Sequence, residues 1–194
     1  KTEAETDGLK AIRWGERALA LRARLAFLRT FDDGWPDVSD EGLHDKRETW
    51  LWPLLDSVQP LAAIPDGALP DGLRAPIPGA RQRALNDLAP ERLETPLGSA
   101  SIDYAAEGGP RVDIRVQELF GVKVHPTVGH GTPLTLALLS PARRPIQMTK
   151  DLPGFWAGSW KDVRADMRGR YPRHPWPEDP SVAAPTNRVK PRGT

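Results

Sequence analysis

The sequence predicts an α+β protein, with a helical N-terminal section followed by a small antiparallel sheet packed with helices. In the first part of the chain, apolar residues recur at spacings of three and four, which is typical of amphipathic helices. From about residue 95 onward, short apolar runs lie between turns rich in proline and glycine, which is typical of strands. A stretch dense in proline and glycine lies between these two patterns.

The clearest helix is predicted over residues 9–31 and ends at the breaker sequence of residues 32–36. Its apolar row consists of Trp14, Ala18, Leu21, Leu25 and Leu28. Six basic residues surround that row, and we expect their aliphatic stems to cover its rim while their charges stay in water. They are Lys10, Arg13, Arg17, Arg22, Arg24 and Arg29. A packed helix with a solvated basic rim is favoured over a nucleic-acid-binding helix.

A second helix is expected from Ser39 or Asp40, either of which can cap it, through residue 55. Pro53 is expected to kink or end this helix. The prolines and glycines that follow exclude long regular elements, except for a short helix over residues 79–88. The predicted organisation is therefore a helical section at 1–57 and a connector at 58–87.

An α+β domain is predicted at 88–180, and it starts with a short strand at 101–104. Residues 112–120 fit a helical face that ends at Gly121, although alternation of Val112, Ile114 and Val116 also fits a strand. Residues 134–139 and 146–149 are predicted strands. Asp151 is expected to cap a helix that runs to Gly169. Residues 181–194 are predicted to be a disordered basic tail.

Composition and length limit the classes of protein that fit. The 194 residues are enough for one domain or two small ones, and there is no cysteine to form a disulfide or a thiolate metal site. The apolar runs are too short for a membrane span, and no signal peptide is recognisable, so we expect a cytoplasmic protein without a membrane partner. Because the sequence begins without methionine, we expect a fragment of a longer protein.

The formal net charge of +1 conceals an uneven distribution. Residues 1–140 contain 16 basic and 21 acidic side chains, whereas residues 141–194 contain 11 basic and 5 acidic ones. A basic C-terminal quarter indicates an anionic partner, of which RNA or DNA is the first candidate, or alternatively a solvated soluble tail. The charge pattern alone does not choose between them.

Two groups of basic residues are the candidate nucleic-acid-binding site. The first surrounds the end of the last predicted helix, where arginines can fork onto phosphates and rings can stack on exposed bases. It contains Arg164, Arg168, Arg170, Tyr171, Arg173, His174 and Trp176. For Tyr171 and Trp176 we favour packing of the tail onto the domain. The second group contains Arg143, Arg144 and Lys150, which could bind phosphate or keep a sheet edge soluble.

Other chemistry has little support in the sequence. His125 and His130 lie five residues apart, which does not place them on one helical face, and their surroundings lack the spacing of zinc sites. There is no G-x-S-x-G elbow, no G-x-G-x-x-G loop and no nucleophile with a plausible base. We therefore expect no catalytic residue, no metal and no cofactor in this chain.

Several blocks of sequence carry a resemblance to a known family. They are "LAPERLETPLGSASIDY" (88–104), "QELFG" (117–121), "LLSPARRPIQ" (138–147), "DLPGFW" (151–156) and "MRGRYPRHPWPEDP" (167–180). In order and spacing these blocks resemble the C-terminal domain of bacterial HrpB-type DExH-box RNA helicases. Residues 1–60 resemble that family more loosely.

The resemblance implies a parent protein whose two motor lobes bind ATP and Mg²⁺, hydrolyse the ATP and translocate on RNA. Neither a G-x-x-x-x-G-K-[ST] loop nor a D-E-x-H box occurs in this chain, so we expect no ATPase site in it. The implied role is an accessory module that contacts nucleic acid, with RNA and the motor domains of the same parent as partners. The alternative is a docking scaffold that braces the motor without contacting RNA, and an independent enzyme is the least favoured reading.

Overall fold

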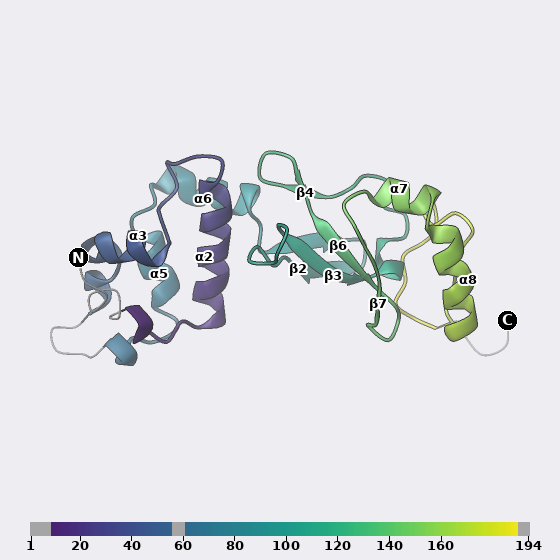
Figure 1. Cartoon of the computed structure of the whole chain (residues 1–194), viewed down its shortest axis with the longest axis horizontal. Coiled ribbons are helices and arrows are strands. Elements are labelled where there is room, and N and C mark those ends of the chain that lie inside the picture. Colours follow the sequence, from purple (N-terminus) through teal and green to yellow (C-terminus); the bar gives the residue numbers. More distant parts are fainter. Residues whose placement is uncertain (1–8, 56–60, 190–194) are drawn as a thin grey trace. The chain divides into compact units, whose positions relative to one another are not determined.

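The structure is a computed structural model that describes residues 9–55 and 61–189. These residues form two compact units that are divided in the sequence between Pro90 and Glu91. Helices make up the first unit, and the second combines small sheets with helices (Figure 1), which confirms the α+β class. Residues 61–87, predicted as a connector, belong to the N-terminal unit.

The N-terminal unit packs short helices around one longer helix, α2 (Glu16–Arg29). The others are α3 (Asp40–Asp45), α4 (Arg47–Trp50), α5 (Leu69–Arg74) and α6 (Gly79–Leu88), together with the 3₁₀ turns η1 (Trp52–Leu54) and η2 (Leu61–Ala63). The bounds of α6 are those predicted from the sequence. The core-facing row of α2 buries Ala18, Leu21, Leu25 and Leu28, which confirms most of the predicted apolar face.

The predicted start of the first helix is wrong, because α2 begins only at Glu16, after an extended Gly15. Trp14 therefore lies in the preceding segment. Its ring stacks on that of Trp50 with centroids 5.9 Å apart, and the Arg22 guanidinium lies 4.5 Å from its centroid. Trp14 is thus a packing residue, but it packs from a loop instead of from the helical face.

Arg24 corrects the expectation that the basic residues of this segment keep their charges in water. Its side chain is only 2% exposed. Its Nε donates to the carbonyl oxygen of Ala89 at 2.6 Å, and its Nη2 donates to Oδ1 of Asn86 at 2.7 Å. Ala89 follows the last residue of α6, where backbone carbonyls lack helical partners. Arg24 therefore fastens α2 to the end of α6.

The second predicted helix is interrupted. Ser39 caps it as expected, because its Oγ accepts from the Gly42 amide at 3.0 Å, but the segment is divided into α3, α4 and η1. The indole of Trp50 donates to the Leu43 carbonyl at 2.8 Å. A continuous helix would use that carbonyl for the amide of Arg47. Tertiary packing of a tryptophan therefore replaces part of the helical ladder.

The C-terminal unit contains a three-stranded sheet in the order β3-β6-β7. Its strands are β3 (Arg111–Arg115), β6 (Thr135–Leu139) and β7 (Pro145–Thr149). A hairpin of β1 (Arg92–Thr95) and β2 (Gly98–Ser101) and a short ladder of β4 (Thr127–Val128) and β5 (Thr132–Pro133) accompany it. The helical elements are η3 (Val116–Leu119), α7 (Leu152–Ala157) and α8 (Trp160–Arg170).

The strands β6 and β7 confirm the two predicted strands, but the sheet is mixed, because β3 runs parallel to β6. The favoured helix over 112–120 is wrong for its first half. Val112 and Ile114 both point into the core, with 0% and 1% exposure, so this segment follows the two-residue alternation of a strand. One 3₁₀ turn follows and ends before Gly121, whose φ of +84° suits glycine. At the predicted strand 101–104, β2 ends at Ser101 and Asp103 makes only a single bridge.

The helix predicted after Asp151 is also divided in two. Asp151 is the cap, since its Oδ1 accepts from the Gly154 amide at 3.0 Å, but α7 ends at Ala157 and α8 starts at Trp160. The break lets five rings gather in one buried cluster. We call this the aromatic cluster, and it consists of Phe120, Phe155, Trp156, Trp160 and Trp176.

Residues 181–189 differ from the disordered tail that the sequence predicts. The Gly121 amide donates to the carbonyl of Pro180 at 2.9 Å, and the Thr186 amide donates to that of Gln117 at 3.1 Å. This stretch therefore follows the surface next to η3. Residues 190–194 lie outside the described residues. None of the described helices is both long enough and apolar enough to cross a bilayer.

Replacing Arg24 by alanine should lower the free energy of unfolding by about 2–3 kcal/mol, because the Ala89 carbonyl and Asn86 lose a buried charged donor. Urea unfolding followed by circular dichroism measures this change. The matched control is Arg17→Ala on the exposed side of α2, which should change stability by less than about 0.5 kcal/mol. Equal losses in the two variants would contradict the role assigned to Arg24.

Candidate nucleic-acid interface

Two members of the second predicted basic group, Arg143 and Arg144, lie at the turn between β6 and β7. The turn is closed by Ser140, whose amide donates to the Arg144 carbonyl at 2.8 Å and whose Oγ accepts from the Arg144 amide at 3.1 Å. Arg143 has a φ of +59° at the tip, a conformation uncommon for a residue with a side chain. Both arginine side chains are exposed. The closed turn therefore presents two adjacent guanidinium groups to solvent.

The first predicted group, which contains Tyr171, is joined to this turn by one hydrogen bond. The Tyr171 hydroxyl and Ser140 Oγ lie 3.1 Å apart, which fixes the end of α8 beside the β6–β7 turn. We call the exposed arginines of the two segments that this hydrogen bond joins the arginine cluster: Arg143, Arg144, Arg170 and Arg173. Within it, Arg170 Nε also pairs with Asp166 Oδ1 at 3.0 Å.

The remaining candidates differ in their surroundings. Arg164 holds the tail, since its Nε donates to the Trp176 carbonyl at 2.9 Å and its Nη2 lies 3.4 Å from Glu178 Oε1. Lys150 Nζ donates to the Gly108 carbonyl at 3.0 Å, and Arg168 is exposed on α8. Whether any of the candidate side chains contacts nucleic acid stays a prediction.

The aromatic residues of the predicted site serve packing. Trp176 is 7% exposed, and its indole donates to the Tyr171 carbonyl at 2.9 Å. The half-buried Tyr171 ring meets His174 edge to face, with centroids 6.3 Å apart. Trp176 therefore packs inside the unit, whereas Tyr171 is only half-buried, and its contact with nucleic acid stays a prediction.

His174 is half-buried beside the arginine cluster. Its Nδ1 lies 3.3 Å from Nε2 of Gln117, a side chain with no exposed surface. Burial lowers the pKa of His174, and the positive charges of Arg115 and Arg173 lower this pKa further. The neutral imidazole is thus the form that suits the folded protein, with Nδ1 free to accept from the Gln117 amide.

A polar hollow of about 590 Å³, which no sequence pattern above indicates, lies between β2 and β3. Arg143 from the turn reaches it together with Arg92 and Arg111, and three acidic side chains also line it: Asp103, Asp113 and Glu118. Its lining charges therefore balance. The alternation of Arg111, Asp113 and Arg115 along one strand was the available signal, but it required knowing that 111–115 is a strand.

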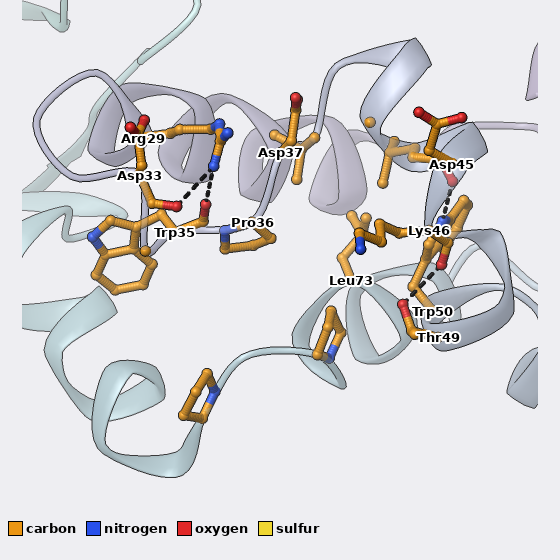
Figure 2. Close-up of a pocket in the computed structure, with 16 residues that line it drawn as sticks. Arg29, Asp33, Trp35, Pro36, Asp37, Asp45, Lys46, Thr49, Trp50 and Leu73 are labelled. Atoms are coloured by element: carbon orange, nitrogen blue, oxygen red, sulfur yellow. Dashed lines mark hydrogen bonds between the residues drawn. The ribbon is translucent and has the colours of Figure 1, made fainter.

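A second cavity of about 570 Å³ lies in the N-terminal unit (Figure 2). Arg29 shapes one wall, because its Nη1 donates to the carbonyls of Asp33 at 2.9 Å and Trp35 at 2.6 Å. Trp35 and Trp50 line it but are almost fully buried. Hydrogen bonds from Ser39 lower the pKa of Asp37 at its rim, which makes that carboxylate a weak base. Its walls therefore consist of structural contacts and buried rings.

The histidine pair predicted not to be a metal site has other partners. His125 Nδ1 accepts from the Leu152 amide at 3.0 Å, in the first turn of α7, so its Nε2 donates to the Leu134 carbonyl at 2.8 Å. Both ring nitrogens of His125 are therefore engaged within the protein. Among the described residues no group of three or more histidine, cysteine, aspartate or glutamate side chains has the arrangement of a metal site.

The fold and these sequence blocks are those of a helicase C-terminal region. Residues 50–180 match the family described as ATP-dependent helicase C-terminal (HrpB_C), and the chain belongs to this family. The chain is 40% identical over 189 residues to the ATP-dependent RNA helicase HrpB of Escherichia coli strain K12. That match covers 94% of this chain but only 23% of the relative, so the chain spans about a quarter of its length.

Solved structures give the same result. A crystal structure of the E. coli DExH-box NTPase HrpB superposes with a TM-score of 0.86 at 38% identity, covering 94% of this chain and 23% of that protein. A structure of the Escherichia coli DEAH/RHA helicase HrpB superposes with a TM-score of 0.72 at 34% identity, covering 89% and 22%. The resemblance that the sequence blocks predict is therefore confirmed.

Replacing His174 by glutamine should flatten the dependence of stability on pH. The folded pKa of His174 lies below its unfolded value of 6.5, so its contribution is complete above that value and is lost as the pH falls through the folded pKa. Urea unfolding at about pH 7.5 and about pH 5 should show a smaller loss of stability in His174→Gln than in the wild type. His44→Gln in the N-terminal unit is the matched control, and a wild-type slope in His174→Gln would contradict the assignment.

Proposed function

We propose that the chain is the non-motor C-terminal region of an ATP-dependent RNA helicase of the HrpB type, and that its C-terminal unit contacts RNA phosphates through the arginine cluster. The hydrogen bond between Ser140 and Tyr171 supports this most directly, because it brings two basic segments from distant parts of the sequence together. The exposed guanidinium groups of these two segments suit a polyanion.

The proposed contact is with the sugar-phosphate backbone of the RNA and not with its bases. Guanidinium groups can fork onto phosphate oxygens, whereas stacking would need exposed rings, and Trp176 and Tyr171 are occupied in packing. Binding through phosphates alone is independent of base sequence and weakens with salt, because bound counterions are released. Such a contact would guide the RNA strand without selecting it.

The parent protein would supply the chemistry. Its motor lobes would bind ATP and Mg²⁺, hydrolyse the ATP and move along RNA, in line with the name of the 40% identical relative. The described chain would then act on the same RNA as a partner of those lobes, in the cytoplasm. Its membership in the helicase C-terminal family supports this arrangement.

The triple variant Arg143→Ala, Arg144→Ala and Arg173→Ala should bind a labelled single-stranded oligouridylate more weakly than the wild type at low salt. Fluorescence anisotropy at several potassium chloride concentrations gives the slope of log affinity against log salt. Each phosphate contact contributes about 0.7 to that slope for single strands, so three lost contacts should reduce it by about 2. The matched control replaces Arg13, Arg17 and Arg83, exposed arginines of the N-terminal unit, and should keep the wild-type slope.

Absence of wild-type binding at low salt would refute the RNA contact and favour docking as the second candidate function. The charge-balanced hollow beside β3 is the observation that favours docking. In that case the chain should bind the separately expressed motor part of its parent while binding oligouridylate poorly.

A further inference from the structure

The hollow of the C-terminal unit lies where two neighbouring strands do not pair into one sheet. The strands β2 and β3 are neighbours (Figure 1), and Asp103 and Arg111 exchange two backbone hydrogen bonds of 2.8 and 2.9 Å as a single antiparallel bridge. Beyond this bridge, the described part of the unit has no ladder between the two strands. The cavity of about 590 Å³ occupies the space where they diverge.

We call the hollow between β2 and β3 the notch. The bridge between Asp103 and Arg111 determines which backbone groups face it. Arg111 directs its amide and carbonyl toward Asp103, whereas the Pro110 carbonyl accepts from Thr135 of the next strand. Since backbone directions alternate along a strand, Asp113 and Arg115 direct their amides away from β6 and toward the notch. The edge of β3 is therefore open over these two residues.

The facing edge of β2 is covered by a side chain. The Arg92 guanidinium donates to the Ser99 carbonyl through Nη2 at 2.8 Å, and to the Ser99 and Ser101 hydroxyls at 2.6 and 2.9 Å. Covering an edge with a long charged side chain prevents further pairing there. Only the β3 side of the notch is thus ready to pair with another strand.

The charged side chains that line the notch are equal in number, but ion pairs within the unit leave Arg92 and Arg143 opposite only one carboxylate, Asp103, whose Oδ1 accepts from the Ala105 amide. This local excess of positive charge favours an acidic occupant. Two arginines on β3 have acidic neighbours, Arg111 with Asp113 at 3.0 Å and Arg115 with Glu118 at 3.8 Å. Arg143 has no acidic partner among the described residues, and Arg92 bonds only to neutral serine groups. The Nε atoms of Arg111 and Arg115 are buried donors without a well-aligned acceptor. An occupant with carboxylates would instead pair with Arg92 and Arg143, which line the notch.

We propose that this notch binds an extended acidic segment of a partner protein, which adds to the sheet as a strand next to β3. The backbone of the segment pairs with Asp113 and Arg115, and its carboxylates meet Arg143 and Arg92. Strand addition of this kind takes affinity from backbone hydrogen bonds and specificity from alternate side chains. The site goes beyond the proposed RNA contact, with which it shares only Arg143.

The test compares two replacements at Asp113 that both remove its carboxylate. Asp113→Ala keeps the edge amide, whereas Asp113→Pro removes it and leaves the β6 pairing intact, because that amide points away from β6. The probe is a fluorescein-labelled peptide of about ten residues that alternates glutamate and valine, titrated with the whole chain. Asp113→Pro should bind it at least about tenfold more weakly than Asp113→Ala.

A second measurement keeps the proposal testable if Asp113→Pro does not fold. In the wild-type chain, the peptide should slow hydrogen exchange at the amides of Asp113 and Arg115, and leave exchange at the amide of Met148, an exposed residue on β7, unchanged. Absence of peptide binding, equal affinities of the two variants, or unchanged exchange at both amides would overturn the proposal. It would also fail if oligouridylate slowed exchange at the same amides, since the notch would then be a nucleic-acid site.

Discussion

The C-terminal unit depends on the packing of its aromatic cluster. Trp160 lies at its centre, with ring centroids 5.5 Å from Phe120 and Trp156 and 6.2 Å from Trp176. Because Trp176 is buried there, residues 171–180 fold back along α8, and Arg164 is needed to hold the Trp176 carbonyl. The same fold-back places Tyr171 against Ser140. Arg170 and Arg173, which lie beside Tyr171 in the sequence, remain exposed to solvent, whereas the nearby Trp176 ring is buried.

Local signals predicted the elements whose structure is decided locally. The caps at Ser39 and Asp151, the helix α6 and the strands β6 and β7 follow from short patterns of side chains and turns. Where tertiary contacts decide, the sequence misled: Arg24 is buried because the end of α6 needs a donor. The segment at 111–115 is a strand because β6 offers a parallel partner far along the chain.

In the candidate site, too, the sequence predicts local features but not those that depend on tertiary contacts. Exposure of the arginines at 143, 144, 170 and 173 and packing of Trp176 could be anticipated, since charged turns stay in water and tryptophans pack. The junction of the two basic segments through Ser140 and Tyr171 could not, because it depends on how the tail folds back. The hollow beside β3 was missed for a similar reason: its walls come from three separate segments.

In the proposed contact, exposed arginines, and not the rings beside them, bind RNA. Magnetic resonance spectra of arginine Nε and tryptophan indole groups, recorded while oligouridylate is added, test it most directly. We expect shifted Nε signals for Arg143, Arg144 and Arg173, with unchanged indole signals for Trp160 and Trp176. Shifted indole signals with unchanged arginine signals would contradict it.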